Sequence, residues 1–202
     1  MDDAAADAEH LGQARDELGA PVRALVDVVA GTAADAEQID HARAQLAAIT
    51  AQLAAPGRRR PRISDPFHPG SLIGGTAHPF APQLTFGRDG DVVTGETTLG
   101  KAFEGGPGLV HGGVLATIFD HAMGAAMYLG GHAAMTRSLD VRYTAPTRLG
   151  VPLRVAARID RVEGRRVVVI AEITQDGVVT AEGESVFVQL TDENIAQIFA
   201  TR

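Results

Sequence analysis

The chain has 202 residues, a formal net charge of −7 at pH 7 and no cysteine. This length accommodates one ordinary domain, or one domain with an extension. The missing cysteines exclude disulfides, thiolate metal sites and a cysteine nucleophile, while the acidic balance and the absence of tryptophan argue against nucleic acid as a partner. The first residues are acidic and alanine-rich, and no apolar run approaches the length of a membrane span. We therefore expect a cytoplasmic protein without a signal peptide or membrane insertion.

Residues 1–55 are predicted to be helical. Apolar residues at alternating spacings of three and four line one narrow helical stripe (Ile39, Ala42, Leu46, Ile49 and Leu53), and Thr32 is the expected N-cap, with Asp35 in the first turn. The earlier stretch 11–29 contains Gly19 and Pro21, so we expect it to be kinked or divided in two. Because narrow stripes bury little by themselves, these helices should dock on the main domain or on a second subunit.

Residues 56–62 are rich in arginine, proline and glycine and predict a solvated linker, although the arginines could instead contact an anion such as a nucleotide phosphate. Residues 63–82 are rich in proline, glycine and histidine and predict a loop or lid. We therefore divide the chain into an N-terminal helical extension with a basic linker, residues 1–62, and a main domain, residues 63–202.

The main domain shows alternating polar and apolar residues, which predict strands, on both sides of one long helix. Strands are expected at 83–88, 92–99, 134–143, 151–160, 165–175 and 178–190, with hairpin turns at Asp89-Gly90, Glu163-Gly164 and Asp176-Gly177. The helix is expected from about Gly112 to Leu129. This order predicts an α+β domain whose single helix covers the apolar face of an antiparallel sheet.

A glycine-rich loop, residues 106–113, opens this helix, and Asp120 follows seven residues after Gly113. Backbone N–H groups at a helix start are free to bind developing negative charge, and a carboxylate can act as a base or nucleophile, so the pair is suited to acyl transfer. An apolar arc should pack on the sheet: Val114, Leu115, Ile118, Phe119, Ala122, Ala126 and Leu129. The opposite stripe should form a second contact surface: Gly113, Ala116, Thr117, Asp120, Gly124 and Met127. Taken singly, Asp120 and His111 could equally make structural hydrogen bonds.

Two motifs together resemble the PaaI-type branch of the hotdog-fold acyl-CoA thioesterases over about residues 83–190. They are His111-Gly112-Gly113-Val114-Leu115-Ala116-Thr117-x-x-Asp120-x-x-x-Gly124 and Asp140-Val141-Arg142-Tyr143-Thr144-Ala145-Pro146-x-x-x-Gly150. The resemblance implies a hotdog fold, in which an antiparallel sheet wraps around a central helix, and a homodimer or homotetramer. It also implies hydrolysis of an acyl-coenzyme A, which we expect to carry a medium- to long-chain fatty acyl group, with no metal or cofactor beyond the coenzyme A of the substrate.

The resemblance also assigns roles to individual residues. Asp120 would be the catalytic carboxylate, acting as general base or nucleophile. The Gly113 backbone N–H, next to Gly112, would polarise the thioester carbonyl, and His111 would orient that carbonyl or the loop. Thr136 would position the lytic water, with its hydroxyl contributed by the neighbouring protomer.

Further residues are candidates for contacts with the substrate. Thr117, Arg137 and Arg142 are expected to bind it, and Lys101 and Arg148 are additional cations for the coenzyme A phosphates, although any of these cations could be a solvated surface charge. The acyl group would lie along the small-residue stripe near Met123 and Met127.

One feature departs from the family pattern. Several relatives carry an Asn or Gln in the loop before the HGG motif, but here the loop reads Phe103-Glu104-Gly105-Gly106. The choice between general base and nucleophile therefore stays open. Two other functions remain: a hotdog hydratase or dehydratase, and a non-catalytic acyl-CoA-binding or assembly module.

Overall fold

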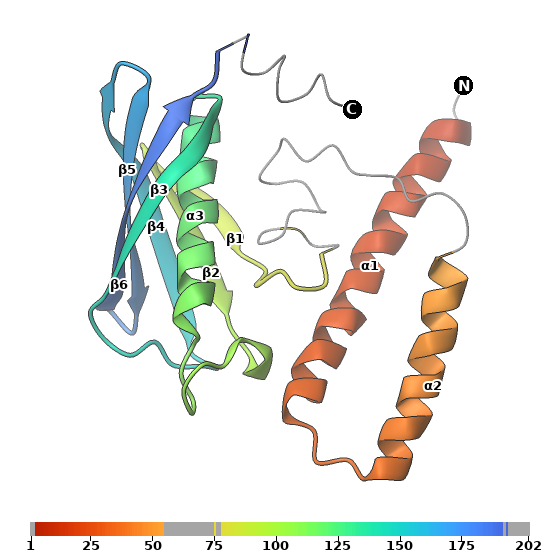
Figure 1. Ribbon diagram of the computed structural model, residues 1–202. Coiled ribbons are helices and arrows are strands. Elements are labelled where there is room, and N and C mark those ends of the chain that lie inside the picture. Colours follow the sequence, from red (N-terminus) through yellow and green to blue (C-terminus); the bar gives the residue numbers. More distant parts are fainter. Residues whose placement is uncertain (1–2, 55–74, 76–77, 192, 194–202) are drawn as a thin grey trace.

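A six-stranded antiparallel sheet wraps around the helix α3, Gly112–Leu129 (Figure 1). The structure is a computed structural model and describes residues 3–54, 75, 78–191 and 193. The strands are β1 (Thr85–Asp89), β2 (Val92–Thr98), β3 (Ala134–Tyr143), β4 (Pro152–Glu163), β5 (Arg166–Gln175) and β6 (Val178–Gln189). A short 3-10 turn, η1 (Lys101–Phe103), precedes α3 (Gly112–Leu129), and the sheet order β1-β2-β4-β5-β6-β3 places β3 at one edge. The predicted hotdog architecture is confirmed.

The predicted hairpin turns have the backbone conformations that such turns need. Gly90 and Gly164 have φ values of +56° and +62°, and Asp176 and Gly177 both lie in the left-handed region, at +52° and +76°. Two successive left-handed residues are typical of the tight turn that matches the twist of the flanking strands, here β5 and β6. These turns fix which residues of each strand face α3.

The core lies between α3 and the sheet. Phe119, Ile118 and Met123 have no exposed surface, and Gly183 of β6 passes so close that a Cβ there would lie 2.9 Å from Met123 Cε. The helix is covered over a wider arc than expected. Met127 was predicted on the open stripe, but it is only 2% exposed, because strands from β2 to β6 contact α3 and curl around it.

The helical extension consists of α1 (Asp3–Gly31) and α2 (Ala36–Leu53), which stand beside the domain (Figure 1). The expectation of two pieces in the first helix was wrong, since α1 runs without a break through Pro21. The expected N-cap of α2 was also wrong: Asp35 caps it, with Gln38 completing a reciprocal capping box. The basic linker 56–62 and the predicted boundary after residue 62 lie outside the described residues.

Candidate active site

The start of α3 is capped by a histidine. His111 is the N-cap residue, and its Nδ1 accepts a hydrogen bond of 3.0 Å from the Gly113 N–H. The amide expected to polarise the substrate is therefore engaged within the chain. The neighbouring Gly112 N–H has no hydrogen-bond partner among the residues that the structure describes, while the Gly112 carbonyl accepts one of 2.8 Å from the Tyr143 hydroxyl. The open donor at this helix start belongs to Gly112.

The loop before His111 is held by its own hydrogen bonds. Glu104 Oε1 accepts from the Gly108 N–H at 2.8 Å, and its second oxygen pairs with Lys101. Hydrogen bonds from Lys101 and then from Gly108 hold the pKa of the Glu104 carboxyl below its usual value. Glu104 is thus committed to shaping the loop, which argues against its replacing the family's missing amide. A Cβ at Gly105 would lie 2.8 Å from His111 Cα, so the close loop path requires glycine there.

Asp120 and Thr136 are brought together by the contact between α3 and β3. The Thr136 hydroxyl donates to Asp120 Oδ1 at 2.9 Å, and both side chains are exposed. The strand register shifts at Arg137, next to Thr136, and such bulges re-aim side chains at strand edges. The resemblance placed this hydroxyl on a neighbouring protomer, whereas here Thr136 reaches Asp120 within one chain.

The two groups of candidate residues lie at different places along α3. Gly112 and Asp120 are separated by eight residues, which corresponds to about 12 Å along a helix axis. A single thioester carbonyl cannot contact both. One chain therefore brings together Asp120 with Thr136, and His111 with its glycines, but it does not unite the two groups.

The predicted substrate-contacting residues are distributed over several surfaces. The Thr117 hydroxyl donates to the Gly113 carbonyl at 2.7 Å, one turn back on α3, so that group is used within the helix. Arg142 lies 3.7 Å from Glu182 and points away from α3, because its neighbour Val141 packs toward the core. Within one chain, Arg142 and Asp120 are not brought together.

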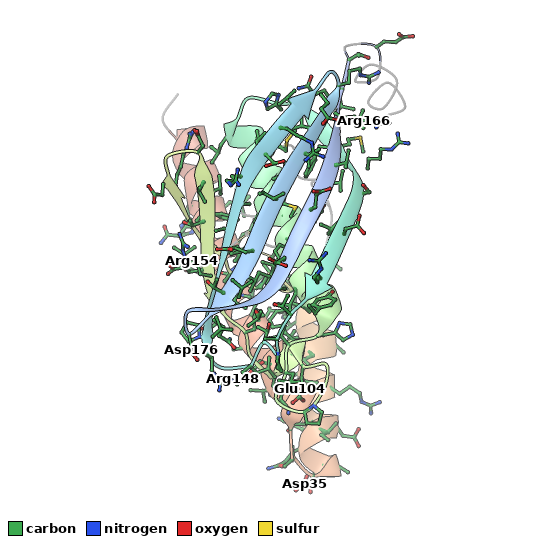
Figure 2. All side chains as sticks on the ribbon, turned by 90° about the vertical axis from the view of Figure 1, so that its left-hand side faces the viewer. Asp35, Glu104, Arg148, Arg154, Arg166 and Asp176 are labelled. Atoms are coloured by element: carbon green, nitrogen blue, oxygen red, sulfur yellow. The ribbon has the colours of Figure 1, made fainter. Side chains whose placement is uncertain are left out.

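The other cations are placed as follows. Arg137 is exposed beside Thr136, which puts a cation next to the carboxylate site. Arg148 pairs with Asp176 at 2.8 Å, and Lys101 pairs with Glu104. Figure 2 shows Glu104, Arg148 and Asp176 at the same end of the sheet.

The small-residue stripe of α3 is open on the single chain. Gly113 and Asp120 are exposed, Ala116 and Gly124 are half-buried, and a Cβ at Gly124 would meet no atom within 4 Å. Met123 and Met127 do not border it, because both are buried in the core. The predicted contact of these methionines with the acyl group is therefore not supported.

Tyr143 was missed as a contributor to the site. It stands in the second motif, but nothing in the sequence alone indicates that its hydroxyl reaches the Gly112 carbonyl across 31 positions. Among the described residues, no group of three or more His, Cys, Asp or Glu side chains could hold a metal ion.

Comparison with known proteins decides the family. A family model described as the thioesterase superfamily matches residues 107–182. A crystal structure of a thioesterase superfamily protein is 30% identical, with a TM-score of 0.79, over 87% of this chain and 90% of that one. The chain belongs to the thioesterase superfamily.

Other known proteins are also similar to this chain, and the solved structures among them share its hotdog fold. The E. coli PaaI protein from the phenylacetic acid degradation operon has a TM-score of 0.50 at 19% identity, covering 52% of this chain and 82% of its own. Acyl-coenzyme A thioesterase THEM4 of Xenopus laevis is 36% identical over 94 residues, which are 45% of this chain and 42% of that protein. The chain thus spans less than half of the length of that relative. In the part of the chain that the structure describes, no helix has the length and apolar character to cross a membrane.

Proposed function

We propose that this chain hydrolyses the thioester of an acyl-coenzyme A to a free acid and coenzyme A. The observation that carries the proposal is the exposed Asp120 carboxylate with the Thr136 hydroxyl 2.9 Å away, on the helix whose start leaves the Gly112 N–H open. Family membership and the name of the Xenopus laevis relative support this substrate class. The medium- to long-chain fatty acyl preference is part of the proposal.

The proposed reaction needs only water as co-reactant. Asp120 takes a proton from water oriented by Thr136, the hydroxide attacks the thioester carbon, and the carbonyl π electrons move onto its oxygen. Collapse of this intermediate breaks the carbon–sulfur bond, and the coenzyme A thiolate leaves and takes up a proton. A placed general base contributes on the order of 100- to 10,000-fold to such a rate. In the alternative route Asp120 attacks directly, and water then cleaves the resulting anhydride.

We further propose that the complete site contains two chains. Since Gly112 and Asp120 lie about 12 Å apart along one helix, Asp120 and Thr136 of one copy must meet the open Gly112 N–H of another copy. This replaces Gly113 by Gly112 as the oxyanion donor, because His111 occupies the Gly113 amide. The β3 edge of the sheet and the open α3 stripe are the surfaces on which a second copy would pack.

The test is thiol release from a panel of acyl-coenzyme A substrates by the wild type, Asp120→Asn and Thr136→Ala. Asp140→Asn is a matched control, because Asp140 is an exposed carboxylate of β3 on the sheet face away from α3. We expect Asp120→Asn to lose at least about 100-fold in kcat and Asp140→Asn to keep it. Undiminished thiol release in Asp120→Asn would refute the proposed site. Tight binding without turnover by the wild type would favour the acyl-CoA-binding module.

A single-turnover reaction in ¹⁸O-labelled water separates the two routes. If Asp120 is a general base, the label enters the first equivalent of product acid. If Asp120 is a nucleophile and water cleaves the anhydride at the Asp120 carbonyl, the first product carries an oxygen from the enzyme carboxylate and the label appears in Asp120. If water cleaves it at the acyl carbonyl, the label enters the product acid as in the first route, and trapping of the anhydride with hydroxylamine separates the two routes. Activity should survive removal of metal ions with EDTA, since the proposed steps use only water and protein groups.

A further inference from the structure

The helical extension contacts the hotdog domain close to the proposed site. Asp27 of α1 accepts a hydrogen bond of 2.8 Å from the backbone N–H of Ala102, 75 residues further along the chain. One turn earlier on α1, Arg23 donates to the His78 carbonyl at 3.2 Å. Ala102 belongs to η1, so the extension is fastened to the turn that leads into the site loop.

Asp27 acts as the cap that η1 lacks. The N-cap residue of η1 is Gly100, which has no side chain to bond the free N–H groups of the turn. The carboxylate from α1 takes that place. A Cβ at Gly100 would collide with Asp27 Oδ1, although the φ of −91° is one that any residue adopts. A side chain at position 100 would therefore displace the Asp27 carboxylate.

From η1 the hydrogen bonds continue to the start of α3. The Phe103 carbonyl of η1 accepts from the His111 N–H at 2.9 Å, and His111 in turn caps the Gly113 amide. Lys101 of η1 also pairs with Glu104, which holds the loop through Gly108. Two residues of η1 thus connect directly to the segment that presents the open Gly112 N–H.

We infer that Asp27 is a positioning residue, through which the N-terminal helix sets the placement of His111 and the Gly112 N–H for the oxyanion. The inference rests on the proposed function for its catalytic consequence. It gives the extension a role at the site. The likeness to the solved superfamily structure covers 87% of this chain, whereas residues 63–202 are only 140 of the 202, so that likeness extends into the helical extension.

The test compares Asp27→Ala and Asp27→Asn with the control Glu17→Ala. Glu17 is an exposed carboxylate on the same helix, where its contact is to Gln13. We expect Asp27→Ala to lower kcat about tenfold with little change in KM, because a displaced oxyanion donor weakens the transition state more than the ground state. Asp27→Asn should recover most of the rate, since its amide oxygen still accepts from Ala102. Glu17→Ala should match the wild type.

Two further measurements separate positioning from general loss of structure. Backbone hydrogen exchange should accelerate in residues 101–113 of Asp27→Ala and stay unchanged in β4, β5 and β6. Gly100→Ala should lower kcat when Asp27 is present. It should lower kcat little further in the Asp27→Ala variant, because the Asp27 carboxylate with which the new Cβ collides is absent there.

The inference fails if Asp27→Ala leaves exchange over residues 101–113 unchanged. It also fails if the effects of Gly100→Ala and Asp27→Ala on kcat are additive in the double variant. A third contrary result is a lower melting temperature in both Asp27→Ala and Asp27→Asn that accounts for the loss of kcat in both. If the wild type hydrolyses no thioester, the proposed function fails. The exchange measurement still decides whether Asp27 holds the loop.

Discussion

At the scale of single residues, the site depends on which amide at the start of α3 is free. The sequence places two glycines after His111, and nothing in their order distinguishes them. The difference arises from the His111 ring, whose Nδ1 takes the Gly113 N–H and leaves that of Gly112 open. An N-cap side chain often bonds an amide of the first turn, and here that bond leaves Gly112 as the proposed oxyanion donor.

Gly112→Pro should therefore abolish most of the activity without disturbing the helix. Proline is well tolerated at the first position of a helix, and His111, at φ −62° and ψ 131°, already has the extended conformation that a following proline needs. Loss of one oxyanion donor is expected to lower kcat by roughly 100- to 1000-fold. Gly112→Ala keeps the N–H and adds the same Cβ near Tyr143, so it is the matched control. Similar kcat values for the two variants would show that the Gly112 amide is not the donor.

At the scale of elements, the packing of α3 on the sheet fixes where the candidate site residues of α3 lie relative to the strands. Gly183→Ala should destabilise the fold by about 1–3 kcal/mol, because the new methyl group would press on Met123 and Phe119, which are both fully buried. In the single chain, Gly124→Ala on the open side of α3 should instead raise the unfolding free energy by up to about 1 kcal/mol through helix propensity. Urea unfolding of both variants measures this contrast. Equal changes in the unfolding free energy of the two variants would contradict a helix with one face packed on the sheet and one face open.

The second helix of the extension supports the prediction that a second subunit covers it. No residue of α2 is buried, and Ile39, Leu46, Ile49 and Leu53 are 38–64% exposed along one stripe. Spacings of three and four are those of helices that pair. Leu46→Glu with Ile49→Glu should therefore weaken self-association at least about tenfold in Kd, as measured by sedimentation.

The control for this pair of changes is Ala44→Glu with Ala51→Glu, which adds the same charges to the opposite face of α2. Equal self-association of the two double variants would show that the stripe does not meet a second copy. No residue of α2 is buried against the described part of the chain, so docking of α2 on its own domain is not supported, and the second subunit remains its proposed partner.

A feature of the fold could be predicted from the sequence when residues close to it in the chain determine it. The bounds of α3 and the hairpin turns were predictable, because a glycine-rich loop, Asp-Gly pairs and periodic residues define them within a few positions. The burial of Met127 was not, because it depends on how strands distant in sequence curl around the helix. The Asp27–Ala102 contact was equally hidden, since it joins residues 75 positions apart.

At the scale of the whole molecule, the fold separates the two halves of the proposed chemistry. The Asp120–Thr136 pair lies midway along α3, while the His111 cap and the open amide lie at its start, joined through η1 to α1. The motif resemblance predicted a site shared between subunits, with Asp120 and Thr136 on different subunits. Because Thr136 contacts Asp120 within one chain, we propose that the division lies between Asp120 and the HGG loop instead.

The most direct test of this account is the activity of mixed dimers. Asp120→Asn and Gly112→Pro chains carrying different affinity tags are co-expressed, and dimers with one chain of each kind are purified through both tags. Each variant alone should be nearly inactive, but a mixed dimer has one site with an intact Asp120 and an intact Gly112 N–H. We predict about half of the wild-type kcat per dimer for thiol release from acyl-coenzyme A. Mixed dimers as inactive as the two parents would contradict a site shared between two chains.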